Sequence, residues 1–377
     1  MANRRGSPLL AWAVLVLACG PGSSALAEEM LRIAVDRAES DIAISGPELV
    51  VSDPASGEMI AQGSPVRVGP ADAGIRVNGK VVASDHLRVL SRGVLVLRNH
   101  SLERQVELHL ERRGGRPRLL VVHEVPIEAY VAATVSSEMP PSWPAEALKA
   151  QAVATRTFAV HRKFNAPDRP YHMEAGVIDQ VYGGAGRMAP TAVEAARATY
   201  GEVLTYHRRP ARTYFHSCCA GHTESSREGW GNALPYLPGV ACGFDSDCPA
   251  AKYRARIPLS QVAAALRGAR IKVQRIDALR ITKRTSTRRV DQLVLDTDRG
   301  EVRLSGEDLR RLVGYTVIKS RMFEARIDGK DLVVEGQGSG HGVGLCQWGA
   351  RGMAVKGRSY DKILLHYYPR TKILRMY

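Results

Sequence analysis

The chain has 377 residues, enough for one large or two medium domains, and its 45% hydrophobic and 24% charged residues are ordinary for a globular protein. Beyond the first residues no window holds about 18 consecutive apolar residues, which excludes a transmembrane helix. The formal net charge of +15 favours an anionic polymer or membrane surface as a partner over nucleic acid, although solubility alone explains such a charge equally well.

The N-terminus has the features of an export signal. Two arginines precede an apolar run at residues 9–18, and Ala-Leu-Ala at 25–27 is typical of a cleavage site. We therefore predict a signal peptide over residues 1–27 and an exported protein of the periplasm or cell envelope. Cleavage removes two arginines and no acid, so the net charge falls from +15 to +13. Lipid attachment at Cys19, which follows a loose lipobox, is the alternative.

Residues 28–120 predict a β-rich N-terminal module. Short apolar or alternating runs are separated by turn residues, a pattern typical of strands. The dipeptide Asn78-Gly79 between two such runs predicts a two-residue hairpin. The expected strands lie at residues 31–35, 65–69, 74–83, 93–99, 105–111 and 118–124.

The remainder, residues 121–377, mixes helices and strands, so the predicted fold class is α+β, with mixed helices and antiparallel sheet. A mixed subdomain is expected at about residues 250–335, where Ser305 and Asp308 form a possible capping box. The basic segment 281–289 within it predicts a solvated turn or hairpin tip. Helices are expected at residues 145–163, 190–199, 258–266, 305–312 and 359–368, and strands at 201–206 and 211–217.

One carboxylate stands out by its surroundings. Glu138 opens the sequence Glu-Met-Pro-Pro-Ser-Trp-Pro, directly before the helix expected at residues 145–163. A lone carboxylate in apolar, stiff surroundings is disfavoured as an anion, so its pKa is expected to rise and to suit a general acid. The alternative is a surface carboxylate whose pKa is lowered by the dipole of the following helix. The residues alone leave both interpretations open.

Four separated blocks resemble the SpoIID/LytB family of bacterial cell-wall proteins, which includes sporulation lytic transglycosylases and amidase enhancers. The order and spacing of the blocks are similar to those of the family over about residues 120–377. The blocks are residues 125–159 with SEMPPSWP, QVYGG at 180–184, residues 214–237 with YFHSCCAGHTE, and residues 338–371 with GSGHGVGLCQWGARG.

The resemblance implies an enzyme that cleaves peptidoglycan glycan strands between N-acetylmuramic acid and N-acetylglucosamine without water, leaving a 1,6-anhydro end. Strands without stem peptides are the expected substrate, an N-acetylmuramoyl-L-alanine amidase is an expected partner, and no cofactor is required. Glu138 would be the catalytic acid and then the base, because one carboxylate suffices when the sugar's own 6-hydroxyl is the nucleophile. The alternative function is a non-catalytic peptidoglycan-binding protein that stimulates an amidase.

Six further residues are expected to contact the substrate, and several of them have a structural alternative. Arg156 is expected either to bind substrate or Glu138, or to form a buried ion pair. Tyr182 and Tyr214 can stack on sugar or belong to the core, and Trp348 favours a core position over a sugar platform. The substrate-binding set is Arg156, Tyr182, Tyr214, Ser217, His341 and Gln347.

Five cysteines follow the signal peptide, and four of them lie within 31 residues. Because export makes disulfides possible, we predict bridges among Cys218, Cys219, Cys242 and Cys248. A zinc site made by these four residues, with His216 or His222, is the alternative. Cys346, which falls where family members often have serine, is expected to be a small packing residue.

The chain departs from the family at a position that resembles a zinc site in many sporulation-type members. In those members one Cys precedes the QVYGG-like block, another lies six residues earlier, and a His lies upstream. Here Asp179 and Met173 occupy the two cysteine positions, and only His172 offers a ligand. A structural zinc site needs about four ligands, so no metal is expected at that position.

Overall fold

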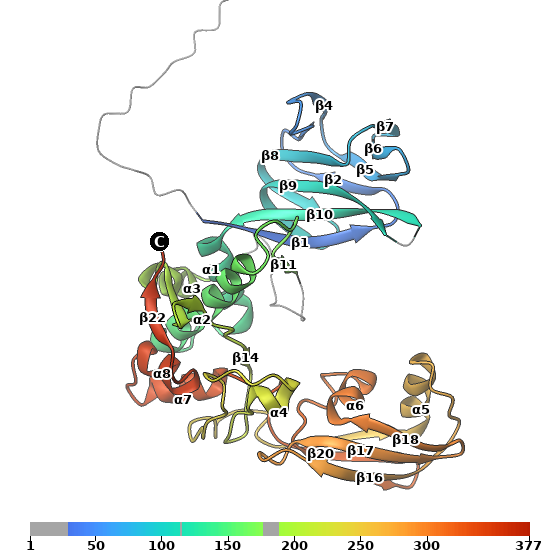
Figure 1. Ribbon diagram of the computed structural model, residues 1–377, viewed down its shortest axis with the longest axis vertical. Coiled ribbons are helices and arrows are strands. Elements are labelled where there is room, and N and C mark those ends of the chain that lie inside the picture. Colours follow the sequence, from blue (N-terminus) through green and yellow to red (C-terminus); the bar gives the residue numbers. More distant parts are fainter. Residues whose placement is uncertain (1–28, 114, 176–187) are drawn as a thin grey trace, which may run out of the picture.

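The computed structural model describes residues 29–113, 115–175 and 188–377, and within them the fold is α+β, as the sequence predicts. Three parts can be distinguished: an N-terminal sheet, a helical region, and a second α+β unit (Figure 1). The predicted signal peptide and the QVYGG block lie outside the described residues. No helix in the described part is both long and apolar enough to cross a bilayer.

The N-terminal part is an eleven-stranded sheet, antiparallel except where its first and last strands pair. Its strands are β1 (Met30–Ala38), β2 (Ile42–Ser45), β3 (Val50–Ser52), β4 (Met59–Gln62), β5 (Val66–Ala71), β6 (Gly74–Val77), β7 (Lys80–Val82), β8 (His86–Leu97), β9 (His100–Arg113), β10 (Arg116–Pro126) and β11 (Met173–Glu174). Their order is β11-β1-β10-β9-β8-β2-β5-β6-β7, and β3 pairs with β8 and β4. Alternating apolar residues of these strands fill the core beneath the sheet.

The predicted hairpin is confirmed, because β6 and β7 pair across Asn78-Gly79 with Val77 opposite Lys80. Asn78 (φ 47°) and Gly79 (φ 85°) both have left-handed backbone conformations, as a two-residue turn of type I′ requires. The module boundary expected at residue 120 falls inside β10, which continues to Pro126 and leads directly into the first helix.

Three helices follow the sheet: α1 (Ile127–Glu138), α2 (Ala145–Phe164) and α3 (Pro190–Ala198). α2 is the central helix, because its many small side chains let neighbours approach on several sides and most of its length is buried. It packs against α1 and α3 and also against α7 (Gln347–Val355) and α8 (Tyr360–Tyr367). The helical region therefore joins the middle of the chain to its C-terminal end.

The sequence predicted α2, α3 and α8 with nearly their observed bounds, but it did not predict α1 or α7. α1 shows no one-sided pattern, because all residues from Tyr130 to Val135 are buried. α7 contains Gly349 and Gly352, which lower helix propensity. A Cβ at Gly349 would lie 2.0 Å from the hydroxyl oxygen of Tyr367, so close packing requires glycine there.

Short strands after α3 join distant segments of the chain. β12 (Glu202–Tyr206) lies between β13 (Arg209–Pro210) and the C-terminal β22 (Lys372–Arg375). β14 (Phe215–His216) pairs in parallel with β21 (Leu345–Cys346). This second pairing brings together two of the four blocks that resemble the family. The short helix α4 (Ser226–Trp230) follows β14 along the chain.

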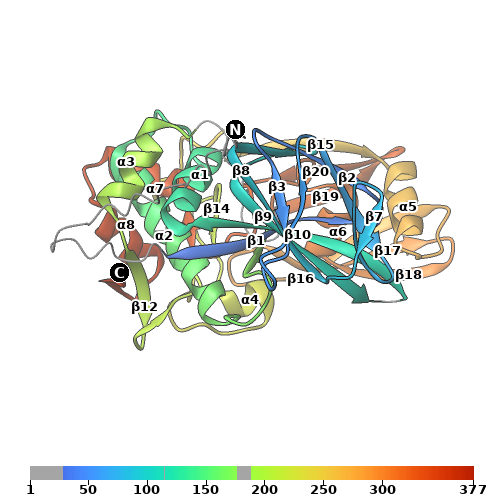
Figure 2. The same ribbon diagram turned by 90° about the horizontal axis from the view of Figure 1, so that it is seen from above.

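Residues 253–336 form a second unit with its own hydrophobic core. It has two three-stranded sheets, ordered β15-β20-β19 and β16-β17-β18, and two helices. The elements are β15 (Tyr253–Pro258), α5 (Leu259–Gly268), β16 (Ile276–Arg284), β17 (Val290–Thr297), β18 (Gly300–Ser305), α6 (Gly306–Val313), β19 (Phe323–Asp328) and β20 (Asp331–Gly336). In two perpendicular views α1, α2 and α3 lie on one side of the molecule, and the N-terminal sheet and the second unit lie on the other (Figures 1 and 2).

The basic segment 281–289 includes the tip of the β16–β17 hairpin, as predicted, and its residues 282, 283, 286 and 288 are exposed, but two other residues of the segment are buried. Arg289 is 2% exposed and Thr285 is 9% exposed. The hydroxyls of Thr285 and Thr287 each donate to Oε2 of the buried Glu224 at 2.7 Å. The sequence did not predict the burial of Thr285, because its partner Glu224 lies 61 residues earlier in the chain and leaves no local signal.

Candidate active site

Glu138 is the last residue of α1 and is half-buried. The next residue, Met139, is 2% exposed and belongs to the core. The carboxylate therefore lies at the C-terminal end of α1 and not in the first turn of α2. At that end the helix dipole is negative and disfavours an anion, so the dipole argument against a general acid does not apply.

The side chain of Gln347 reaches Glu138 from a distant part of the chain. Its Nε2 donates to Oε2 of Glu138 at 3.3 Å, and the two residues are 209 positions apart. Gln347 is the first residue of α7 and is 6% exposed. Beside this contact the rings of Trp143 and Trp348 meet edge to face, with centroids 5.0 Å apart. The first and last family-like blocks thus meet at the carboxylate.

A close approach of two backbone segments places Gln347. Gly344 immediately precedes β21 and has φ 78°. A Cβ at this position would lie 2.0 Å from the carbonyl oxygen of Tyr214, so only glycine allows the approach. β21 then leads directly into α7, which begins at Gln347. The glycine-rich segment is therefore part of the geometry that brings Gln347 to the carboxylate.

Ser217 lies in a pocket of about 480 Å³ that it shares with Trp348, Ser339, Tyr315 and Lys319. The carbonyl of Ser217 also accepts a hydrogen bond from the backbone N–H of Trp348 at 3.1 Å. Trp348, predicted in the core, is half-buried and forms part of the pocket wall. Hydroxyls, aromatic rings and an ammonium group together suit a polar polymer such as a glycan.

His341 is held by two backbone groups. Its Nε2–H donates to the carbonyl of Phe215 at 2.9 Å, and its Nδ1 accepts from the N–H of Val343 at 3.1 Å. Burial lowers the pKa of His341 to about 4, in agreement with a neutral ring. The ring of Trp230 lies 5.1 Å from that of His341 and 4.4 Å from that of Tyr214. His341, Trp230 and Tyr214 therefore form one aromatic cluster, in which both ring nitrogens of His341 are engaged by backbone groups.

Arg156 does not line a groove. Its side chain is fully buried, and its guanidinium forms a two-point ion pair with Glu128 at 2.6 and 2.7 Å. It also donates to the backbone carbonyls of Ala196 and Glu202 at 3.0 and 3.2 Å. Substrate cannot reach a fully buried side chain, so the expected substrate contact of Arg156 is wrong. Arg156 instead forms the buried ion pair that the sequence analysis gave as the alternative.

The region of the family's zinc-like site holds a different arrangement here. Tyr182 and Asp179 lie outside the described residues, so the substrate contact of Tyr182 stays a prediction. His172 is engaged by Arg32, whose backbone N–H donates to Nδ1 at 3.1 Å and whose guanidinium lies 3.0 Å from Nε2. Met173 is buried in β11. His172 therefore fastens the sheet to the segment after α2.

The five cysteines of the described residues are all buried and free in the structure. Disulfides were predicted among Cys218, Cys219, Cys242 and Cys248, and none is formed here; their oxidation in the exported protein stays a prediction. Cys346 is not an isolated packing residue. Its sulfur lies in one group with the sulfurs of Cys219 and Cys242 and a carboxylate oxygen of Asp245.

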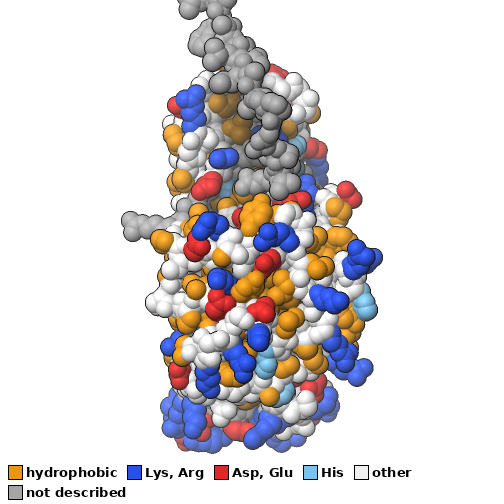
Figure 3. All heavy atoms as spheres, turned by 90° about the vertical axis from the view of Figure 1, so that its left-hand side faces the viewer, with side chains coloured by type: hydrophobic (Ala, Val, Ile, Leu, Met, Phe, Trp, Pro, Cys, Tyr) orange, Lys and Arg blue, Asp and Glu red, His pale blue; other side chains and the backbone are white. Residues whose placement is uncertain are grey.

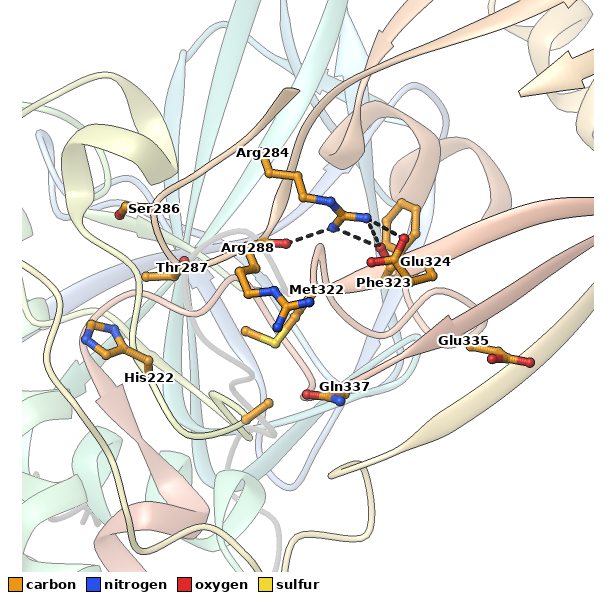
Figure 4. A pocket seen from close by; sticks show the side chains of 11 residues that line it. His222, Arg284, Ser286, Thr287, Arg288, Met322, Phe323, Glu324, Glu335 and Gln337 are labelled. Atoms are coloured by element: carbon orange, nitrogen blue, oxygen red, sulfur yellow. Dashed lines mark hydrogen bonds and ion pairs between the residues drawn. The ribbon is translucent and has the colours of Figure 1, made fainter. Parts of the chain in front are cut away.

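A larger pocket, of about 610 Å³, lies where the tip of the β16–β17 hairpin meets the segment around His222 (Figure 4). Arg284 on its wall is paired with the carboxylate of Glu324 at 2.6 Å. Figure 4 shows Arg288 reaching into the same space from the hairpin tip. Glu138 lines neither this pocket nor the pocket at Ser217, but the pocket at Ser217 includes Trp348, the residue next to Gln347, and is therefore the one beside the candidate acid.

Charged side chains are spread over the helical side of the molecule. Figure 3 shows Lys and Arg distributed among Asp and Glu on this face, with hydrophobic side chains between them. On this side the positive charges therefore form no single patch. The net positive charge predicted to attract an anionic polymer would raise the rate of encounter with it more than it would provide a defined contact.

Comparison with known proteins agrees with this geometry. Residues 116–206 match the family model of the stage II sporulation protein SpoIID, and residues 252–344 match a domain of unknown function. An uncharacterized protein of Brachyspira hyodysenteriae is 33% identical over 257 residues, which cover 68% of each chain. The chain belongs to the SpoIID/LytB family.

Two relatives of the SpoIID/LytB chain carry informative names. Stage II sporulation protein D of Bacillus subtilis is 32% identical over 271 residues, or 67% of this chain and 75% of the relative. The amidase enhancer of the same organism is 28% identical over 288 residues, or 63% of this chain and 39% of the relative. Membership of the family supports a cell-wall-related function and placement in the cell envelope.

Three residues near the site were not identified from the sequence. Trp230 lies in a family-like block, so its position beside His341 could have been suspected from the block alone. Tyr315 and Lys319 come from the second unit, where no motif marks them. Their contribution follows only from the way the second unit packs beside Ser217.

Proposed function

We propose that the protein is a peptidoglycan lytic transglycosylase that cleaves the bond between N-acetylmuramic acid and N-acetylglucosamine in glycan strands. The contact between Glu138 and Gln347 carries this proposal. It gives a half-buried carboxylate at a helix C-terminus one defined hydrogen-bond donor, beside a pocket with hydroxyl and aromatic groups.

In the first step Glu138 acts as a general acid. Its carboxyl proton passes to the glycosidic oxygen while the bond from that oxygen to C1 of N-acetylmuramic acid breaks. The carboxylate that forms is stabilised by the N–H of Gln347, because a hydrogen bond to an ionised acceptor is stronger than one to a neutral acceptor. The leaving sugar departs with a new hydroxyl group.

In the second step the same carboxylate acts as the base. It takes the proton of the 6-hydroxyl of N-acetylmuramic acid while the oxygen of that hydroxyl bonds to C1. The product has a 1,6-anhydro end, and Glu138 is protonated again. Glu138 therefore gives up one proton and regains one in each reaction cycle. No water enters the reaction, and positioning of the internal nucleophile supplies much of the rate.

The neighbouring pocket provides the binding groups. Ser217 and Trp348 would contact the strand close to Glu138, and Lys319 would approach it from the second unit. His341 and Tyr214 would shape the wall behind them. Glycan strands freed of stem peptides by an amidase are the proposed substrate, which would make an amidase a functional partner in the envelope.

A second function is favoured by one observation, the similarity to an amidase enhancer. In that case the protein binds glycan strands without cleaving them and stimulates an amidase. The same pocket would serve as the binding surface, and Glu138 would have no chemical role.

The two functions are separated by one substitution. Wild type, Glu138→Gln and the control Glu194→Gln, an exposed carboxylate on α3, are incubated with stem-peptide-free glycan strands. Products are analysed by mass spectrometry for 1,6-anhydro ends. We expect Glu138→Gln to lower the rate by about 10²–10⁴, the usual contribution of a general acid, with no change in Glu194→Gln.

A wild type that yields no anhydro ends would exclude the enzyme. Equal product from wild type and Glu138→Gln would exclude Glu138 as the acid. Stimulation of an amidase by both forms, without cleavage by either, would establish the enhancer.

A further inference from the structure

The cysteines that follow the signal peptide divide into two groups. Cys218 and Cys219 are consecutive, but their side chains enter different clusters. Cys218 packs with Cys248 in a small buried cluster. Cys219 instead faces Cys242 and Cys346. The second group contains three sulfurs, so a disulfide between two of them would leave the third as a free thiol.

A carboxylate completes the second group. One oxygen of Asp245 and the sulfurs of Cys219, Cys242 and Cys346 all lie within 4.8 Å of one another. The three cysteines are at most 1% exposed and Asp245 is 6% exposed. Oδ2 of Asp245 lies 3.2 Å from Sγ of Cys219 and 3.9 Å from Sγ of Cys346, the two sulfurs of the group that it approaches. Cys218, outside the group, also approaches this oxygen, with its Sγ at 3.7 Å.

These separations match a tetrahedral metal site. With zinc–sulfur bonds of about 2.3 Å and zinc–oxygen bonds of about 2.1 Å, tetrahedral geometry places sulfur and oxygen about 3.6 Å apart. The two measured separations lie on either side of that value. Three soft thiolates and one carboxylate, closed off from solvent, are the ligand set of a structural zinc ion more than of a hard cation.

We propose that Cys219, Cys242, Asp245 and Cys346 hold one structural zinc ion. This site differs from the zinc-like position before the QVYGG block and from a set made of the four neighbouring cysteines. The proposal does not depend on the proposed enzymatic function.

Backbone donors are already directed at two of the ligands. The N–H groups of Cys219 and Gly349 each donate to Sγ of Cys346 at 3.3 Å. The N–H of Gly221 donates to Oδ2 of Asp245 at 3.2 Å. Hydrogen bonds of this kind orient metal ligands and favour the ionised sulfur. Cys346 also lies at the N-cap of α7, where the helix dipole favours an anion.

A buried cation offsets the charge of such a site. Three thiolates and one carboxylate carry more negative charge than a dication neutralises, which leaves a net charge of −2 on the site. The guanidinium of Arg289 is 2% exposed and donates to the carbonyls of Cys219 and His222 at 2.9 and 3.0 Å. Because Arg289 comes from the β16–β17 hairpin tip, the second unit supplies a compensating charge to the cluster.

Without a metal the three sulfurs cannot ionise together. Three thiolates at these short separations would repel one another in a site closed off from solvent. A dication removes this conflict, since metal binding displaces the thiol protons from all its cysteine ligands.

The location gives the ion a role in the fold. It would tie the segment after β14, the loop at residues 242–245 and the start of α7. Cys346 directly precedes Gln347, whose side chain touches Glu138. Zinc on one side of this turn would therefore fix the position of Gln347 on the other side.

The test uses the full mature chain purified from the envelope of the expressing cell without chelator. Zinc is measured by inductively coupled plasma mass spectrometry, and disulfides are mapped on non-reduced peptides. We expect one zinc per chain and no bridge involving Cys219, Cys242 or Cys346. Cys242→Ser should lower the zinc content several-fold, whereas the matched control Cys248→Ser should retain it.

A second readout does not require variants to fold. Zinc is removed from the wild type under reducing conditions and replaced by Co²⁺ alone. Thiolate-to-cobalt charge-transfer absorption together with intense visible bands of tetrahedral Co²⁺ would support the site. A zinc-free native protein with a Cys219–Cys242 bridge would overturn the proposal. Equal zinc in wild type and Cys242→Ser, or octahedral Co²⁺ spectra, would overturn it as well.

Discussion

Two regions of the molecule meet at Glu138 but are held together differently. One is the helical region of α1, α2 and α3, and the other is the loop region, defined as residues 214–248 and 336–347. The helices bury long continuous apolar runs, and the ion pair of Arg156 and Glu128 links them. The strands of the loop region are two residues long. There, contacts between side chains and backbone, such as those of His341, replace an extended strand ladder.

The difference shows how the fold separates support from chemistry. In the proposed enzyme, helix α1 ends at the carboxylate, and the short segments contribute Gln347 and the residues of the pocket at Ser217. Short segments can present side chains from many directions, as binding sites require. Changes to the buried contacts between the helices should therefore act mainly on folding, and changes to the side chain of the loop region that contacts Glu138 should act mainly on activity. Four experiments test the stability and activity of the two regions.

The largest effect is expected for Arg156→Met in the helical region. Removing one partner of a buried pair leaves an uncompensated charge on Glu128, so the free energy of unfolding should fall by about 3–5 kcal/mol. Denaturant titration measures it. The control Arg197→Met removes the exposed pair with Glu194 and should cost less than about 1 kcal/mol. Similar losses in both variants would contradict a structural role for Arg156.

Acid should weaken the loop region through His341. Burial lowers the pKa of His341 from 6.5 to about 4, so below pH 6.5 the unfolded chain binds a proton that the folded chain does not. The stability associated with the neutral ring is present above pH 6.5 and is lost as pH falls to about 4, by on the order of 3 kcal/mol. Denaturant titrations across this range should show a shallower decline for His341→Gln. An unchanged decline would rule out this assignment.

Gln347→Ala should affect activity more than folding. A hydrogen bond to a charged group contributes about 1.5–3 kcal/mol, so the rate of anhydro-end formation should fall about 10- to 100-fold. The fall should appear in kcat more than in KM, because the bond strengthens as Glu138 becomes a carboxylate. Gln337→Ala, in the larger pocket, is the matched control and should leave the rate unchanged. If the role of Gln347 is purely structural, Gln347→Ala would lower the melting temperature and leave kcat unchanged.

The sequence predicted those parts of the fold that depend on neighbouring residues. The hairpin at Asn78-Gly79, the helix α2 and the resemblance of four blocks all rest on patterns within short windows. Glu138 was singled out in the same way. These features were identified because a turn dipeptide, an apolar periodicity or a motif is visible without knowledge of distant contacts.

The features that the sequence could not predict depend on residues far apart. The burial of Arg156 requires Glu128 and the end of α3, and the group around Cys346 requires residues more than a hundred positions earlier. Likewise, the strand expected over 211–217 is only Phe215–His216, because β21, the strand with which it pairs, is equally short. Local propensity carries no information about such pairings.

The smallest effect is expected in the second unit, where the capping box predicted from Ser305 and Asp308 is present. The hydroxyl of Ser305 accepts from the N–H of Asp308 at 2.9 Å, and the carboxylate of Asp308 accepts from the N–H of Ser305 at 3.3 Å. Ser305→Ala should lower the free energy of unfolding by about 1 kcal/mol without changing the rate of anhydro-end formation. Ser359 is also an N-cap residue, at α8, but its side chain makes no capping hydrogen bond. Ser359→Ala should therefore cost less than Ser305→Ala in the same denaturant titration, and an equal cost would show that the capping bond does not stabilise α6.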